Sequence, residues 1–171
     1  MLVYNRISVA CCAGLVLIAS TTTLAAAPKA VRVAIYSDAG ATKAGVKQVE
    51  DCLPKSDGFE VKRITADEIR AGSLRNFDVV IYPGGSASKQ SETLGEPGRD
   101  FVKNFVHDGH GFIGICAGAY LASTQYKWSL GVLDAQVIDG AHWARGEGNV
   151  KLRLTSAGEQ ALQPNKETCI I

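Results

Sequence analysis

The chain has 171 residues, a length that suits one domain. Hydrophobic residues make up 46% of it and charged residues 20%, values that exclude a disordered or collagen-like chain. Its 18 Lys and Arg against 17 Asp and Glu give a formal net charge of +1, so we expect no general attraction to nucleic acid or to an anionic membrane surface.

The first 27 residues have the composition of a secretory signal peptide. A single cation, Arg6, precedes an apolar run over residues 7–19, and small residues at 25–27 close the segment. The run is shorter than the roughly 20 apolar residues that a membrane span needs. We therefore expect residues 1–27 to be removed, and residues 28–171 to form the mature domain without a stable membrane span.

Cleavage after Ala25 or Ala26 is favoured over cleavage directly before Pro28. The expected location is periplasmic or secreted. A buried N-terminal helix and an uncleaved anchor are the alternatives. Acylation at Cys11 or Cys12 is disfavoured, because these residues lie before or within the apolar run rather than after it.

Three of the five cysteines would remain after cleavage: Cys52, Cys116 and Cys169. An odd number leaves at least one thiol outside an internal disulfide in an oxidising compartment. Pairing of Cys52 with Cys169 stays open, because spacing alone does not show that the two come within bonding range. The spacing does not suit a zinc site, and no cofactor motif is present, so we expect neither metal nor cofactor.

The first half of the mature chain alternates between strands and helices. Alternating and β-branched residues predict strands at 31–36 and 59–65. Apolar residues at helical spacing predict a helix at 42–53, and Thr65 is placed to cap a short helix at 66–71.

The second half continues the alternation and predicts a mostly parallel sheet with helices on both faces. The strand at 77–82 is almost entirely apolar, as expected for a strand that is covered on both sides. After it we expect, in order, a polar loop to about Gly95, a helix from Pro97 to Gly109, a strand at 111–115, a short helix at 117–124, and strands at 130–138 and 150–154.

Two glycine-rich segments follow predicted strands, where an open α/β sheet gathers its ligands. One is residues 83–85; the other is residues 114–118, which have the form G-x-C-x-G around Cys116. This pattern, known with serine in hydrolases, holds a nucleophile on a sharp turn between a strand and a helix. The alternative is a structural cysteine in a tight turn.

Backbone N–H groups near this turn are candidates to stabilise an oxyanion. The N–H of Ala117 follows the sulfur directly, and the N–H of Gly84 or Gly85 could supply a second donor. The sequence therefore predicts Cys116 as nucleophile, with these three residues at the oxyanion site.

The stretch from Phe77 to Ser123, with FDVVIYPGG and GFIGICAGAYLAS, resembles the class I glutamine amidotransferase-like superfamily. Within it, the chain is most similar to the domain found in the N-terminal region of biotin-protein ligase, and GAHWARGEGNVKLRLT adds to this. The resemblance covers roughly Val31 to Leu162. It implies a flavodoxin-like α/β three-layer sandwich with a mostly parallel central sheet. It also implies the same site residues, but not biotin ligation, whose chemistry belongs to a different domain.

The chain departs from that superfamily in its late catalytic motif. Class I amidotransferases supply a base and its orienting carboxylate from an H-x-E motif, which is absent here. The domain is also expected to be short at its C-terminus. Either the chain is a shortened or frame-disrupted version of the domain, or another residue supplies the base. His142 is the best substitute base, and a surface histidine stacked on Trp143 is the alternative.

Other polar residues are expected to be structural or solvated. Asp38 could orient a base or bond to the thiol, although a turn-forming role is favoured. The others are His107, His110, Glu92, Glu96 and Arg145, the last of which could instead bind a substrate carboxylate.

These features predict an exported thiol-dependent hydrolase or amidotransferase-like enzyme for a small amide or peptide-like substrate. A catalytically inactive relative that binds a ligand or partner, and a redox-responsive thiol protein, are the alternatives. The oligomeric state stays open.

Overall fold

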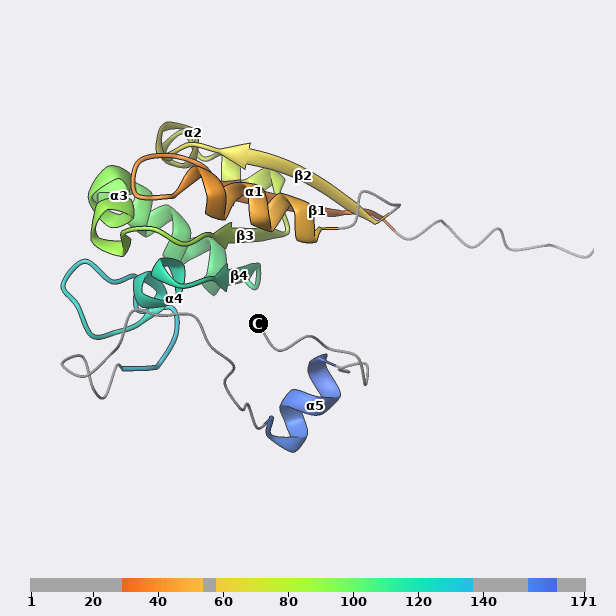
Figure 1. Cartoon of the computed structure of the whole chain (residues 1–171). Coiled ribbons are helices and arrows are strands. Elements are labelled where there is room, and N and C mark those ends of the chain that lie inside the picture. Colours follow the sequence, from red (N-terminus) through yellow and green to blue (C-terminus); the bar gives the residue numbers. More distant parts are fainter. Residues whose placement is uncertain (1–28, 54–57, 137–153, 163–171) are drawn as a thin grey trace, which may run out of the picture.

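The computed structural model describes residues 29–53, 58–136 and 154–162 (Figure 1). None of the helices in these ranges is long and apolar enough to cross a membrane. Its elements are β1 (Val31–Tyr36), α1 (Lys43–Cys52), β2 (Phe59–Ile64), α2 (Ala66–Arg70), η1 (Ser73–Asn76), β3 (Val79–Tyr82), α3 (Ala87–His107), β4 (Gly111–Gly114), α4 (Ala117–Ala122) and α5 (Ser156–Leu162).

The four strands form one parallel sheet in the order β2-β1-β3-β4. This order places the two central strands beside each other and sends each connecting helix across a face of the sheet, as in flavodoxin-like folds. The expected α/β sandwich with a parallel sheet is confirmed. The carboxyl ends of all four strands consequently lie along one edge.

Side chains alternate between the two faces of the sheet, because successive residues of a strand point in opposite directions. On one face, Val33 and Ile35 pack with Ile81 against Val46 and Val49 of α1. The other face forms the larger cluster with α2, α3 and α4, and Tyr36, Tyr82 and Phe112 stack there with ring centroids 4.8 and 5.3 Å apart. Helices therefore cover both faces of the central strands.

The edge strand β4 is less covered than the central strands β1 and β3. Ile113 and Ile115 are 48% and 45% exposed. Ile113 pairs in register with Ile81 and so shares the face on which α1 lies, but α1 packs against the central strands. Coverage of both faces is thus confirmed for the strand at 77–82, for which it was predicted, whereas Ile113 of β4 stays exposed on the α1 side.

Local capping sets the starts of α1 and α2, and the cap at Thr65 confirms the prediction from the sequence. The Thr65 hydroxyl accepts from the Glu68 N–H, and the Glu68 carboxylate accepts from the Thr65 N–H, which forms a capping box at α2. Thr42 caps α1 in a similar way by accepting from the Gly45 N–H.

The predicted polar loop before Gly95 is wrong, because Ala87–Leu94 is helical. Ser86 caps this helix, and Gly95, with φ 63° and ψ 178°, breaks it ahead of Pro97, near which the second half begins as predicted. The error has a physical cause: the buried positions include Gln90 and Ser91, whose polar side chains hide the apolar period of the helix.

The predicted strand at 130–138 is also wrong over residues 130–136, which contain no strand. Their backbone groups bond to the end of α4 instead: the N–H of Leu130 donates to Leu121, and the N–H of Leu133 donates to Ala122. Residues 137–138 and most of the predicted strand at 150–154 lie outside the described residues, and Leu154 is not in a strand.

One ion pair ties the starts of the central strands together. The Arg32 guanidinium donates two hydrogen bonds to the Asp78 carboxylate, at 3.0 and 2.6 Å, and the Arg32 N–H donates a third at 2.8 Å. These bonds hold the pKa of Asp78 well below its ordinary value, chiefly through the Arg32 side chain.

Asp78→Asn is expected to weaken the dependence of stability on acid pH. A depressed carboxyl pKa stabilises the fold above about pH 4, and this contribution is lost as the pH falls below that value. Urea unfolding at pH 7 and pH 3 should show a smaller difference for the variant than for the wild type. Glu92→Gln, at an exposed pair with Lys89, is the control and should leave the difference nearly unchanged. Equal differences for Asp78→Asn and the wild type would contradict the assigned role.

Candidate functional site

Cys116 lies directly after β4 and forms the N-cap of α4, in the turn predicted from the sequence. Its φ of 54° and ψ of −107° make it the single non-glycine residue with positive φ among those described. Backbone strain of this kind persists where the surrounding structure enforces it, and it accompanies nucleophiles on strand-to-helix turns. The side chain is exposed and in a free thiol state.

Close packing explains the two glycines that flank this turn. A Cβ on Gly114 would lie 2.5 Å from the carbonyl carbon of Gly118, and a Cβ on Gly118 would lie 2.2 Å from the carbonyl oxygen of Tyr82. Real Cβ atoms do not approach backbone so closely, so any larger residue would push α4 away from the sheet. The G-x-C-x-G spacing therefore seats α4 directly on β3 and β4.

The second glycine-rich segment meets the first, as the sequence predicts. A Cβ built on Gly84 would lie 3.6 Å from the Cβ of Cys116 and 3.9 Å from its sulfur, so Gly84 lines one side of the thiol. Gly85 forms an antiparallel bridge with Ala41, and its φ of 148° and its contact with the Gly40 carbonyl leave no room for a side chain.

Several backbone N–H groups near the sulfur have no backbone acceptor among the described residues. In the first turn of α4, Gly118 donates to Ile115 and Ala119 donates to Cys116, but Ala117 donates to none of the described carbonyls. The same holds for the N–H groups of Gly84 and Gly85. These are the three predicted oxyanion donors, and none of them donates to a backbone carbonyl of residues 29–53, 58–136 or 154–162.

Gln90 is a residue of this site that the sequence analysis missed. It is fully buried, and its Nε2 donates to the carbonyl of Pro83 at 3.0 Å and to that of Gly40 at 3.4 Å. Its Oε1 has no partner among the described residues. Gln90 thus links the loops after β1 and β3, and no local signal could show this because its partners are distant backbone carbonyls.

Gln90→Met is expected to destabilise the protein by about 1 kcal/mol, measured by urea unfolding. The variant leaves the buried Pro83 carbonyl without its donor, and this cost is partly offset because the unpaired Oε1 is also removed. Glu92→Met, on the exposed side of the same helix, is the control and should change stability by less than about 0.5 kcal/mol. If Gln90→Met leaves the free energy of unfolding unchanged, the loops after β1 and β3 keep their positions without the hydrogen bonds of Gln90.

Asp38 is a turn-forming residue, as favoured from the sequence. One carboxylate oxygen accepts from the Ala39 N–H at 2.7 Å, and the other accepts from the Ala66 N–H at the start of α2 at 3.0 Å. Both oxygens are therefore engaged by backbone groups rather than by a base or a thiol.

The two described histidines lie at the opposite edge of the sheet from Cys116. His110 precedes β4, and its ring stacks on Phe105 with centroids 4.3 Å apart, while His107 is 90% exposed beside Asp108. Both are structural or solvated, as expected. Neither is placed to act on Cys116.

The remaining candidates are solvated or lie beyond the described ranges. Glu92 and Glu96 are exposed, as predicted. Cys52 is exposed and free, and residues 29–53, 58–136 and 154–162 contain no cluster of metal-binding side chains. His142, Arg145 and Cys169 lie outside the described residues, so the role of His142 as base stays a prediction and the pairing of Cys52 with Cys169 stays open.

Comparison with known proteins gives a family match and matches among the solved structures. A putative peptidase E from Listeria monocytogenes EGD-e is 21% identical with a TM-score of 0.45, over 59% of this chain and 54% of that one. The chain thus spans about half the length of that protein. No curated protein matches the chain. The model of the family described as "Biotin-protein ligase, N terminal" matches residues 31–142, more than half of the chain, so the chain belongs to this family.

Proposed function

We propose that the protein is an exported, thiol-dependent hydrolase or amidotransferase-like enzyme of the class I glutamine amidotransferase type, acting on a small amide or peptide-like substrate. The observation that carries the proposal is the backbone of Cys116. A strained, exposed thiol at the edge where the parallel strands end, with Gly84 beside it, has the geometry of a nucleophile rather than of a core cysteine.

The chemistry follows from these positions. The Cys116 thiolate would add to the amide carbonyl carbon, forming an S–C bond while the π electrons move to the oxygen. The N–H groups of Ala117 and of Gly84 or Gly85 would then donate to that oxyanion. As the C–N bond breaks, the leaving amine takes a proton, and water later hydrolyses the thioester to the carboxylic acid and free thiol.

A base must take the thiol proton and return it to the amine. His142 remains the residue that we propose for this role, because the described histidines lie at the other edge of the sheet. In the family match it stands at the last matched position.

A second reading is a non-catalytic thiol that responds to oxidation. It is favoured by the exposure of Cys116 together with the distance of His107 and His110 from it, which leaves no base for this thiol among the described histidines. In an oxidising compartment such a thiol forms sulfenic acid or mixed disulfides.

Trapping of an acyl-enzyme separates the two readings. The protein is incubated with a panel of small activated esters and amides, and peptide mass spectrometry locates any adduct. We expect acylation at Cys116 and none at Cys52, which is equally a free, exposed thiol. His142→Ala should abolish the acylation. Labelling of Cys116 by a sulfenic-acid reagent after mild oxidation, with no acylation by any substrate, would overturn the enzymatic proposal.

A further inference from the structure

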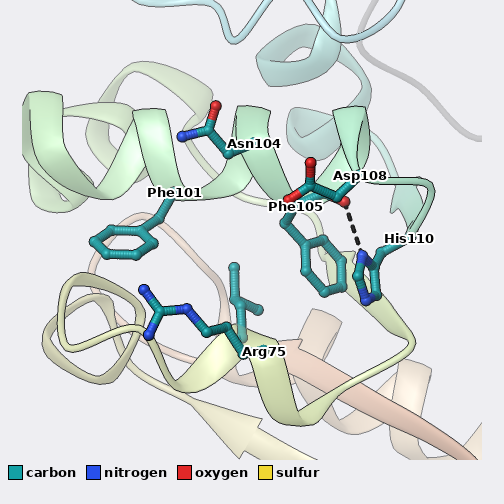
Figure 2. Close-up of a pocket in the computed structure, with 7 residues that line it drawn as sticks. Arg75, Phe101, Asn104, Phe105, Asp108 and His110 are labelled. Atoms are coloured by element: carbon teal, nitrogen blue, oxygen red, sulfur yellow. Dashed lines mark hydrogen bonds between the residues drawn. The ribbon is translucent and has the colours of Figure 1, made fainter.

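A pocket lies far from Cys116, between η1 and the C-terminal half of α3 (Figure 2). Its volume is about 280 Å³. His110 stands on its rim just before β4, so the pocket opens at the edge where the strands begin. A ligand bound here is therefore not a ligand of the candidate nucleophile.

The floor of this pocket is apolar. Leu74 and Phe105 are 2% and 5% exposed, and Phe101 is half-buried at one side. The His110 ring stacks on Phe105, and its Nδ1 lies 3.1 Å from the Phe105 carbonyl oxygen. Because a carbonyl only accepts, Nδ1 carries the proton and donates, which fixes the ring at the pocket wall.

One end of the pocket carries the Arg75 cation, which has no ion-pair partner among the described residues. The Arg75 guanidinium lies over the Phe101 ring, 5.6 Å from its centroid. Gly72, with φ +83°, also lies beside the guanidinium, since a Cβ there would come within 3.3 Å of it. No carboxylate in the described part of the chain lies within ion-pair distance of Arg75.

The other end carries an anion. The Asp108 carboxylate lies on the His110 side of the pocket, whereas Arg75 points toward Phe101 (Figure 2). Its one described ion-pair contact is with His107, at 3.8 Å, on a side chain that is 90% exposed. Asn104 adds an amide to the rim.

We propose that this pocket binds an α-amino acid with an apolar side chain. Its carboxylate would bind Arg75, its ammonium group would bind Asp108, and its side chain would cover the floor formed by Leu74 and Phe105. A zwitterion fits because the pocket carries one positive and one negative end. A simple anion would meet Asp108, and a simple cation would meet Arg75.

Isothermal titration calorimetry of the full mature chain with L-phenylalanine tests the site. Phenylacetate lacks the ammonium group, phenethylamine lacks the carboxylate, and glycine lacks the side chain. Each is expected to bind at least about tenfold more weakly than phenylalanine, because each loses one of the three contacts. Thermal unfolding with the same ligands should show the same order.

Variants assign the contacts. Arg75→Met and Asp108→Asn should each weaken phenylalanine binding by about tenfold or more, whereas Arg75→Lys should retain part of it. Asp108→Asn should strengthen the binding of phenylacetate, since it removes the repulsion. Lys103→Met is the matched control on α3, because its ammonium group faces Asp100 rather than the pocket. It should bind as the wild type does.

The proposal is overturned by equal affinities for phenylalanine and phenylacetate, by wild-type binding in Arg75→Met, or by no binding at about 10 mM. Circular dichroism checks that each variant folds, and the exposed position of both side chains favours this. Because Cys116→Ala should leave the binding intact, failure here is distinguishable from failure of the proposed enzymatic function.

Discussion

Cys116→Ser is expected to lower turnover of an identified amide substrate by about a thousandfold or more. Serine keeps the size of the side chain and can take the same strained backbone, so the fold should be unchanged. What is lost is the thiolate, since a serine hydroxyl needs a strong base close by and the described residues place none there. Steady-state kinetics of the purified mature protein measure the effect.

Two further variants make this result specific. Cys116→Ala should match Cys116→Ser in its loss of activity, because both lack the sulfur. Cys52→Ala removes the other free, exposed thiol and should retain wild-type turnover. Turnover that survives in both Cys116 variants would place the chemistry elsewhere and remove Cys116 from the mechanism.

Gly118→Ala is expected to destabilise the protein by about 3 kcal/mol, a large share of the stability of an ordinary domain. The added Cβ would lie 2.2 Å from the Tyr82 carbonyl oxygen, and this neighbour is backbone in a central strand that cannot turn aside. The α4 helix must shift away from β3, which also moves Cys116. Urea unfolding measures the loss.

Gly158→Ala is the matched control for that variant, since it makes the same change in another helix. Its Cβ would lie 3.4 Å from the Thr155 hydroxyl oxygen and 3.7 and 3.8 Å from side-chain carbons of Leu154, which are ordinary contacts. It should leave stability unchanged or raise it by up to about 1 kcal/mol, through the higher helix propensity of alanine. If Gly118→Ala is as stable as Gly158→Ala, close packing of α4 on the sheet is not the reason that position 118 requires glycine.

The elements that could be predicted from the sequence are those whose signals are local. The alternating strand at 31–36 was correct at both ends, and Thr65 capped the helix that it was expected to cap. The α3 segment before Gly95 could not be predicted in this way, because its burial uses Gln90 and Ser91 rather than apolar side chains. The periodicity signal depends on apolar residues alone. It therefore cannot detect a buried polar residue whose hydrogen-bond partners lie in other segments of the chain.

The turn at Cys116 could be predicted from the sequence, because the G-x-C-x-G pattern between a strand and a helix is a local signal. The parallel α/β class could also be predicted, from the order of the elements. The contact of Gly118 with Tyr82 of β3, in contrast, joins distant segments. The surroundings of the sulfur likewise depend on how distant parts of the chain come together in the fold. The strand order brings Gly84 against Cys116, Gln90 joins the loops after β1 and β3, and His107 and His110 lie at the other edge of the sheet. All of these are relations between segments that are distant in the sequence. They depend on the order of the strands and on the connections between them, and local composition does not determine them.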